Sequence, residues 1–223
     1  MSPVLNQVPV IAIDGPSASG KGTVAQLVAN QLGFNYLDSG ALYRIVALAA
    51  LKNNIAWSDQ MALVHLVNTL YIQFKNNQIF LNDVDVTELV RNENVGRGAS
   101  EVAVHPLVRG ELLDLQHSFR KQPGLVADGR DMATVVFTDA DLKVFLTADV
   151  SIRAERRYKQ LLSRNIAADF DAILLDLKVR DERDSGRSTA PLKHAEDAYL
   201  LNTDHLSITK ATQQVIKWYS KQV

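Results

Sequence analysis

The chain lacks several features, and each absence removes a class of protein. Its 223 residues contain no cysteine, which excludes disulfides, cysteine zinc sites and thiol chemistry. The formal net charge is −1, so a general nucleic-acid or anionic-membrane surface is not expected. The longest apolar run, 45–51, is too short to span a bilayer, and residues 1–8 show no signal-peptide pattern. We therefore expect a soluble, cytoplasmic, monomeric protein without nucleic-acid or membrane partners.

Residues 15–23 carry the clearest functional pattern. They read Gly-Pro-Ser-Ala-Ser-Gly-Lys-Gly-Thr and follow the apolar run Val-Ile-Ala-Ile-Asp at 10–14. The phosphate-binding pattern G-x-x-x-x-G-K-[ST] is matched at every position except the last. Gly22 stands at that last position, and Thr23 comes one residue later. The match predicts that the chain binds a nucleoside triphosphate.

The residue types in this loop suit an anion. Gly15 and Gly20 permit a tight turn whose backbone N–H groups face the anion at the positive end of the next helix. Lys21 adds a full charge near the β- and γ-phosphates. A glycine-rich turn that only joins a strand to a helix is the alternative, but it leaves the lysine unexplained. The predicted ATP-binding residues are Gly15, Pro16, Ser17, Ala18, Ser19, Gly20, Lys21, Gly22 and Thr23.

Apolar patterns along the rest of the chain predict an α/β fold, a P-loop three-layer sandwich with a mostly parallel central sheet. Helical patterns separate short apolar runs, as βαβ units require. The runs that resemble buried parallel strands are 8–13, 125–127 and 142–148. One predicted helix begins near Lys21 and ends at Gly33. Two more helices are predicted over 41–52 and 101–120.

Residues 70–87 follow a different pattern. Apolar residues alternate with polar ones up to Phe74, a polar turn covers 75–78, and Asn-Asp at 82–83 marks a second turn. This pattern predicts an antiparallel meander inserted into the α/β core. Such an insert is a candidate domain for a second substrate, and a hairpin without a ligand is the plainer alternative.

Arginine is concentrated in one part of the sequence. Seven of the thirteen arginines are Arg153, Arg156, Arg157, Arg164, Arg180, Arg183 and Arg187. Positions 180, 184 and 187 follow helical spacing, so one face presents two guanidinium groups around the carboxylate of Asp184. A solvated helix face with ion pairs is the alternative. Because the chain carries a triphosphate loop, we favour a lid that neutralises phosphate charge and excludes water.

Two polar segments stand at the ends of predicted elements. Asp38-Ser39-Gly40 opens the helix that contains Arg44, and Asp38 or Ser39 suits its N-cap. Asp-Gly-Arg-Asp at 128–131 follows the strand predicted at 125–127, at the edge where open α/β sheets bind ligands. Ser100 and Arg109 give no signal by themselves, and the histidines show no metal-binding spacing.

Four motifs in this order closely resemble bacterial cytidylate kinases. They are Gly-Pro-Ser-x-Ser-Gly-Lys-Gly-Thr, Leu-Asp-Ser-Gly-Ala-Leu-Tyr-Arg at 37–44, Ala-Asp-Gly-Arg-Asp at 127–131 and Arg-Asp-Glu-Arg-Asp at 180–184. The resemblance covers almost the full chain and implies a three-part kinase that converts ATP and CMP, or dCMP, to ADP and CDP, or dCDP. The implied parts are a core of about 1–65, 95–152 and 190–223, a monophosphate-binding insert of about 66–94, and a short helical lid of about 153–189.

The resemblance also implies roles for individual residues. The implied cytosine pocket consists of Ser39, Ser100, Arg109 and Asp131. The implied acceptor-phosphate ligands are Arg44, Arg130 and Arg187, and the residues implied for the sugar are Arg180 and Asp184. Lys21, Arg130, Arg187 and Arg157 are the expected catalytic residues. The resemblance implies Mg²⁺ bound through ATP phosphates and water, with no side chain as a direct metal ligand.

Some residues depart from the family pattern, and rivals remain. Ala133 stands where the family often has glycine, and Ala18-Ser19 stand where Gly-Ala is frequent. A longer lid of the adenylate-kinase type is not apparent, which places that branch, including the eukaryotic UMP/CMP enzymes, second. Another small-molecule P-loop kinase and a nucleotide-dependent switch are the further alternatives, although the Asn-Lys-x-Asp pattern of GTPases is missing.

Overall fold

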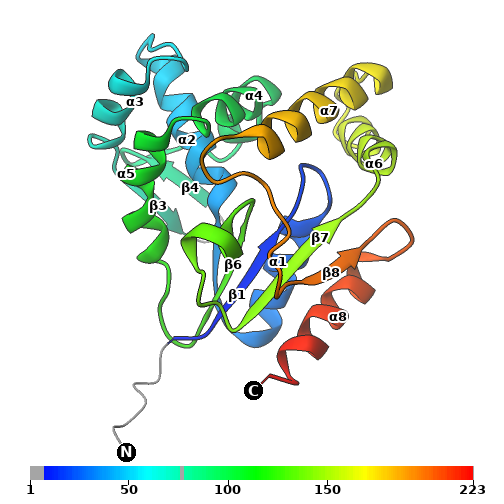
Figure 1. The fold of residues 1–223 in the computed structure, drawn as a ribbon. Helices are drawn as coiled ribbons and strands as arrows, with labels where there is room; N and C mark the ends of the chain where they lie inside the picture. The colour runs from blue at the N-terminus through cyan, green and yellow to red at the C-terminus, as the bar shows by residue number, and fades with distance from the viewer. Residues whose placement is uncertain (1–7, 76–77, 223) are drawn as a thin grey trace, which may run out of the picture. The chain divides into compact units, whose positions relative to one another are not determined.

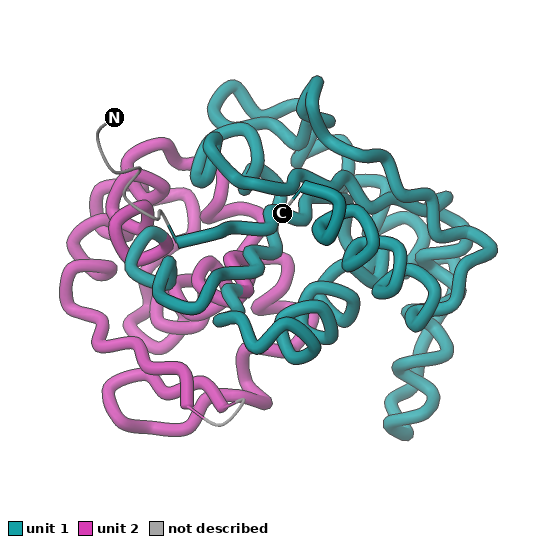
Figure 2. Tube along the Cα trace, turned by 90° about the horizontal axis from the view of Figure 1, so that it is seen from below, with its two compact units in different colours: residues 1–37, 117–223 teal, residues 38–116 magenta. Residues whose placement is uncertain are grey.

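The computed structural model describes residues 8–75 and 78–222. The chain divides into two compact units (Figure 2). Unit 1 consists of Met1–Leu37 and His117–Val223, and unit 2 consists of Asp38–Gln116. No helix in the described residues is long and apolar enough to cross a membrane.

Unit 1 contains a five-stranded sheet with the strand order β2-β6-β1-β7-β8 (Figure 1). Strand β1 pairs in parallel with β6 and with β7, and β7 pairs in parallel with β8. Every side chain of β1 and β6 is buried, as expected for central strands of a parallel sheet. The strands are β1 (Val10–Asp14), β2 (Asn35–Asp38), β6 (Leu125–Gly129), β7 (Leu142–Thr147) and β8 (Tyr199–Asn202).

Two helices of unit 1 share a hydrophobic core with this sheet. Val24 of α1 and Val215 of α8 are buried together with Ile11 and Ile13 of β1. The first helix begins at Lys21 and is closed by Gly33 with a φ of 68°, which confirms the predicted start and end. The helices are α1 (Lys21–Leu32), α6 (Val150–Leu162), α7 (Phe170–Gly186), α8 (Ile208–Tyr219) and the π-helical segment η2 (Met132–Val136).

Unit 2 is mostly helical. Asp38 caps α2, since its Oδ1 accepts a hydrogen bond from the N–H of Ala41 at 2.9 Å. The single helix predicted over 101–120 is wrong: one helix ends at Val102, and Pro106, which suits a first helical position, begins the next. The helices are α2 (Ser39–Lys52), α3 (Gln60–Val67), α4 (Glu93–Val102), α5 (Pro106–His117) and the 3₁₀ segment η1 (Leu89–Arg91).

A three-stranded antiparallel sheet completes unit 2 and confirms the predicted meander. Asn82 and Asp83 form the second turn with φ values of 49° and 63°, as two-residue hairpins require. The centre of the first predicted turn, 76–77, lies outside the described residues. The strands are β3 (Ile72–Lys75), β4 (Gln78–Leu81) and β5 (Val84–Asp85). The predicted α/β class, with a mostly parallel central sheet and a small antiparallel one, is therefore confirmed.

Each unit contains one of the chain's two tryptophans. In unit 2, the Nε1–H of Trp57 donates to the carbonyl of Ala47 at 3.1 Å. In unit 1, Trp218 stacks on Tyr199 with ring centroids 4.6 Å apart. Both indoles thus have defined packing partners.

Candidate active site

The loop at 15–23 joins β1 to α1 at the carboxyl end of the central strand. A Cβ on Gly15 would lie 2.0 Å from the carbonyl oxygen of Leu146, so only glycine fits there. Gly20 has a φ of 90° and forms the N-cap of α1. The Nζ of Lys21, 9 % exposed, lies 3.4 Å from the carbonyl oxygen of Pro16 and 3.8 Å from Oδ1 of Asp128. The loop therefore offers an anion site at a helix N-terminus with a buried ammonium beside it.

Gly22, the one mismatch to the phosphate-loop pattern, has a structural explanation. A Cβ on this residue would lie 2.9 Å from Oδ2 of Asp128 and 3.6 Å from the hydroxyl of Tyr36. The Tyr36 hydroxyl also donates to that carboxylate at 3.3 Å. A serine or threonine would have to displace this pair, so a carboxylate occupies the neighbourhood where other loops place a hydroxyl.

Arg130 connects three segments of unit 1. Its Nε donates to Oδ2 of Asp184 at 2.7 Å, and its Nη2 donates to the hydroxyl of Ser17 at 2.7 Å. Burial alone would lower the pKa of Arg130, but the nearby carboxylates of Asp184, Asp128 and Asp14 raise it above the ordinary value. The guanidinium thus stays charged between the phosphate loop and α7.

Asp184 lies in the last turn of α7, within the segment expected to form a lid. Burial alone would raise its pKa, but Arg130, Arg187 and Lys21 hold it below the ordinary range. Its backbone carbonyl accepts from the Nε of Arg187 at 3.3 Å. Arg180 lies one turn earlier on α7, and its Nε pairs with Asp176 at 2.9 Å.

These three residues near the end of α7 do not form a solvated face. Arg180, Asp184 and Arg187 are only 8 %, 5 % and 8 % exposed. Burial lowers the pKa of the Arg180 guanidinium below its ordinary value. Only the first two residues lie on α7, because the helix ends at Gly186 and Arg187 follows in extended conformation. The predicted i, i+4, i+7 face is therefore wrong for its last member.

Two arginines of α6 contact the loop backbone; both were counted in the arginine-rich segment, but neither was assigned an individual role. Nη1 of Arg153 donates to the carbonyl of Ser17 at 3.0 Å, while its Nη2 pairs with Asp181 at 2.5 Å. Nη1 of Arg156 approaches the carbonyl of Ser19 at 3.5 Å. Arg157, the catalytic candidate from this helix, donates to Gln160 at 2.5 Å. Three arginines within five positions give no sequence signal that separates them until the helix register is known.

Asp14 and Asp131 are two further buried carboxylates close to this network. The carboxylate of Asp14 accepts from the N–H groups of Met132 and Ala133, each at 2.8 Å. Burial raises the pKa of Asp14 to about 7 although these two bonds oppose the shift. Asp131 is 3 % exposed and is the N-cap residue of η2.

Unit 2 holds the other four predicted nucleotide contacts. The hydroxyl of Ser39 accepts from the Nε2 of Gln116 at 2.8 Å, and Nη1 of Arg44 donates to the carbonyl of Val90 at 2.9 Å. The guanidinium of Arg109 lies over the Tyr43 ring, 5.3 Å from its centroid. The buried hydroxyl of Ser100 has no hydrogen-bond partner in the described residues. Sequence reasoning missed the supporting roles of Gln116 and Tyr43.

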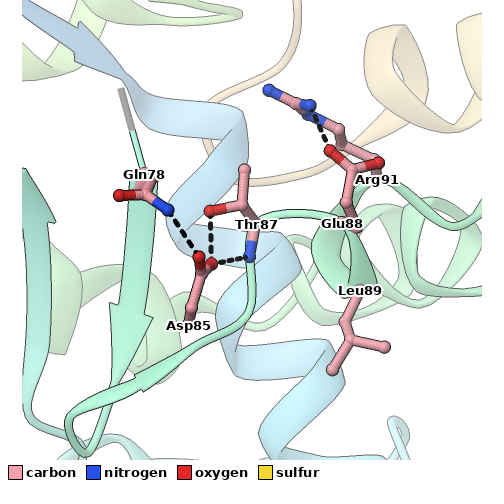
Figure 3. A pocket seen from close by; sticks show the side chains of 6 residues that line it. All are labelled: Gln78, Asp85, Thr87, Glu88, Leu89 and Arg91. Carbon is pink, nitrogen blue, oxygen red and sulfur yellow. Dashed lines mark hydrogen bonds and ion pairs between the residues drawn. The ribbon is translucent and has the colours of Figure 1, made fainter. Parts of the chain in front are cut away.

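A hollow of about 520 Å³ lies on the small sheet of unit 2 (Figure 3). None of the predicted site residues lines it. Its polar groups bond to one another: Asp85 accepts from Gln78 at 2.7 Å, and Arg91 pairs with Glu88 at 2.6 Å. The lining residues are Gln78, Asp85, Thr87, Glu88, Leu89 and Arg91.

A family model described as "Cytidylate kinase" matches residues 11–221. The chain belongs to the cytidylate kinase family. It is 58 % identical over 219 residues to the cytidylate kinase of Polynucleobacter asymbioticus, which covers 98 % of this chain and 100 % of that protein. It is 56 % identical over 214 residues to the cytidylate kinase of Paraburkholderia phymatum, which covers 96 % of this chain and 94 % of that protein.

A solved structure supports the fold alone. An uncharacterized protein from Eubacterium ventriosum matches with a TM-score of 0.54 at 10 % identity, covering 95 % of this chain and 98 % of that one. Ala18, which stands where the resemblance leads us to expect glycine, adopts a φ of 59°. This left-handed conformation costs a residue with a Cβ about 1 kcal/mol, whereas glycine adopts it freely.

The residues at the loop fit magnesium that is carried by phosphates and water. In the described part of the chain, no three His, Asp or Glu side chains gather as a metal cage. The carboxylate of Asp128 stands beside Lys21, 3.8 Å from its Nζ, at the edge that holds the phosphate loop. Mg²⁺ commonly keeps several waters when it binds substrate phosphates, and a carboxylate beside it can accept hydrogen bonds from those waters. This donor set therefore matches the cofactor that kinases of this kind use with ATP.

Proposed function

We propose that the protein transfers the γ-phosphoryl group of ATP to CMP or dCMP, giving ADP and CDP or dCDP. The observation that carries the proposal is Arg130, whose guanidinium bonds both the phosphate-loop hydroxyl of Ser17 and the lid carboxylate of Asp184. An arginine shared by the two segments suits a reaction in which a phosphoryl group passes from one nucleotide to another. Membership in the cytidylate kinase family supports the same reaction.

The arginines are proposed to hold the phosphates. Planar guanidinium groups match a dianionic phosphate with two parallel hydrogen bonds each. We assign Arg44, Arg130 and Arg187 to the acceptor phosphate, and Arg180 and Asp184 to the sugar and its neighbouring phosphate.

The cytosine base is proposed to lie against four further side chains. Cytosine presents an exocyclic amine donor, which a carboxylate or serine oxygen accepts, and an O2/N3 edge that suits a guanidinium. A carboxylate facing position 4 would reject uracil, which presents an acceptor there. We assign this pocket to Ser39, Ser100, Arg109 and Asp131.

Positioning and charge neutralisation account for the chemistry. The acceptor is already a phosphate oxyanion, so no general base is required. Lys21 faces the β- and γ-phosphates, and with Arg130, Arg187 and Arg157 it stabilises charge on the transferred group. Mg²⁺, bound through ATP phosphates and water, supplies further charge neutralisation. We also propose that residues 153–189 form the lid that excludes water and that residues 66–94 form the insert over the monophosphate.

A nucleotide panel tests this function. ADP release is measured by a coupled assay with CMP, dCMP, UMP, AMP and shikimate as acceptors at equal concentration. Preferred turnover of CMP or dCMP is expected. A strong preference for UMP or AMP would assign another monophosphate, and rapid ATP hydrolysis without an acceptor would favour a switch or regulatory ATPase.

A further inference from the structure

The start of η2 is capped by a carboxylate from a distant strand. The N–H groups of Met132 and Ala133 donate to Oδ1 and Oδ2 of Asp14, each at 2.8 Å. In most helices the N-cap residue's own side chain accepts these bonds. Here the N-cap is Asp131, and its side chain makes no capping bond. Asp14, the last residue of β1, performs the capping for a segment 118 residues further along the chain.

The sheet register explains why Asp14 reaches this position. In the parallel pairing of β1 with β6, Asp14 is the partner of Gly129, the residue before Arg130. A Cβ on Gly129 would lie 2.8 Å from Cγ of Met132, so the Met132 side chain covers Gly129 closely. The Arg130–Asp131 pair is therefore held on one side by the strand and on the other by the two bonds to Asp14.

This capping bond is made at a buried site where a carboxylate is costly. Asp14 is 1 % exposed, and its surroundings include the carboxylates of Asp128 and Asp131 as well as the Arg130 guanidinium. An apolar side chain would avoid the cost of burying charge, but it would leave two buried N–H groups without an acceptor. The first turn of η2, directly after Arg130 and Asp131, would then lose both of these hydrogen bonds.

We propose that Asp14 is a positioning residue that orients Arg130 and Asp131 toward the acceptor nucleotide. The inference rests on the roles proposed above for those two residues. It predicts that substitutions of Asp14 change KM for CMP more than KM for ATP, although Asp14 directly precedes the ATP loop in sequence. The packing of Gly15 against Leu146 fixes the first turn of that loop. The Asp14 side chain, in contrast, accepts hydrogen bonds from η2.

The test compares Asp14→Asn and Asp14→Ala with a matched control, an aspartate that accepts a backbone hydrogen bond from the same strand. Asn keeps the shape and one acceptor oxygen, while Ala removes both acceptors. Asp141→Asn is the control, because Oδ2 of Asp141 accepts from the N–H of Val10 at 2.7 Å, at the opposite end of β1. Steady-state KM values for CMP and ATP are measured for each variant, together with Tm.

The expected result is a split between the two substrates. Asp14→Asn should raise KM for CMP by about tenfold, and Asp14→Ala by more, since buried donors lose their acceptor. KM for ATP should change by less than about threefold in both variants, as for an effect transmitted only to the acceptor side. Asp141→Asn should leave both KM values unchanged even where it lowers Tm. Calorimetric titration of CMP without ATP repeats the test with Asp14→Asn if Asp14→Ala does not fold.

Two outcomes would overturn the inference. Equal rises in both KM values would assign Asp14 to fold stability alone, and wild-type KM values in Asp14→Asn would show that the capping bonds do not matter. If the wild-type protein prefers a different monophosphate, the proposed function fails. KM for that monophosphate and KM for ATP are then compared in the same variants, so the role of Asp14 is tested separately from the identity of the acceptor.

Discussion

Asp14 and Asp85 each end a strand, one in the parallel sheet of unit 1 and one in the antiparallel sheet of unit 2. Both carboxylates accept short hydrogen bonds: Asp14 from two backbone N–H groups at 2.8 Å, and Asp85 from the N–H of Thr87 at 2.9 Å and its hydroxyl at 2.6 Å. Their pKa values nevertheless move in opposite directions. Burial raises the pKa of Asp14 to about 7, whereas the bonds from Thr87 lower the pKa of Asp85.

A different effect dominates the carboxyl pKa in each sheet. In the small sheet, water solvates the carboxylate, so hydrogen bonds decide its pKa. At the carboxyl end of β1, desolvation outweighs two good hydrogen bonds. Buried polar groups of unit 1 should therefore matter strongly for function and stability, and polar groups on the small sheet only weakly.

The largest expected effect is that of Lys21→Ala, which removes the buried ammonium at the loop. We expect kcat to fall by about a hundredfold to a thousandfold, as when one preorganised charge-stabilising group is removed. Steady-state turnover of CMP at saturating ATP measures it. Lys143→Ala is the control, since Lys143 lies on β7 and its Nζ pairs with the exposed Asp197 at 2.7 Å. Near-normal turnover in Lys21→Ala would refute the catalytic role.

Gly22→Ser tests how closely the loop is packed. Its Cβ would meet Oδ2 of Asp128 at 2.9 Å, so the carboxylate and Tyr36 must move. We expect kcat/KM for ATP to fall by about tenfold or more, the usual scale of an overpacked site. Gly110→Ser is the matched control, because a Cβ at Gly110 meets nothing within 4 Å. Equal activity of the two variants would show that the loop accommodates the larger side chain without loss of function.

Asp131→Ala separates the two nucleotides. The side chain is buried at the proposed base pocket, so we expect KM for CMP to rise by about tenfold through loss of a charged hydrogen-bond acceptor. KM for ATP should change much less. Similar changes in both constants would place Asp131 outside the base pocket.

The pH dependence of stability sharpens the comparison. The folded-state pKa of Asp14 is raised from 3.8 to about 7, so the folded protein binds the extra proton between these values. The contribution of the Asp14 carboxyl group to the free energy of unfolding is complete below pH 3.8 and is lost as the pH rises through about 7. Between pH 6 and 8 the free energy of unfolding should fall by about 1 kcal/mol from this group. Urea titrations at several pH values should show a flatter dependence in Asp14→Asn; an unchanged slope would contradict the assignment.

Asp85→Asn should give the smallest effect and the opposite sign. Because the folded-state pKa of Asp85 is lowered, its contribution to stability exists above the ordinary pKa and is lost as the pH falls below it. The variant should have a slightly lower Tm than the wild type at pH 7, and the gap should close in acid. A Tm loss as large as that of Asp14→Asn would break the comparison between the sheets.

Local patterns explain why much of the fold could be predicted. The helix from Lys21 to Leu32 has an apolar face and a terminal glycine, and the meander has turn residues at its second hairpin. The short edge strands β2 and β8 were missed because each has only four residues, of which one is buried. Helix 101–120 was predicted too long because apolar spacing continues across Pro106.

The site is harder to predict, since its supports join distant parts of the chain. The phosphate loop and the Asp-Gly-Arg-Asp segment are visible as motifs. The capping of η2 by Asp14 is not, because it depends on the register of β1 with β6. The same holds for Arg153 and Arg156, whose contacts with the loop depend on how α6 is rotated.

The placement of the tryptophans also makes the two units separately observable by fluorescence. Trp57 reports on unit 2 and Trp218 on unit 1, and each indole can be replaced by phenylalanine to leave a single emitter. Because the chain has no cysteine, one introduced thiol would be the only site for a dye. Energy transfer to that dye from the indole of the other unit would follow the distance between the units as nucleotides are added.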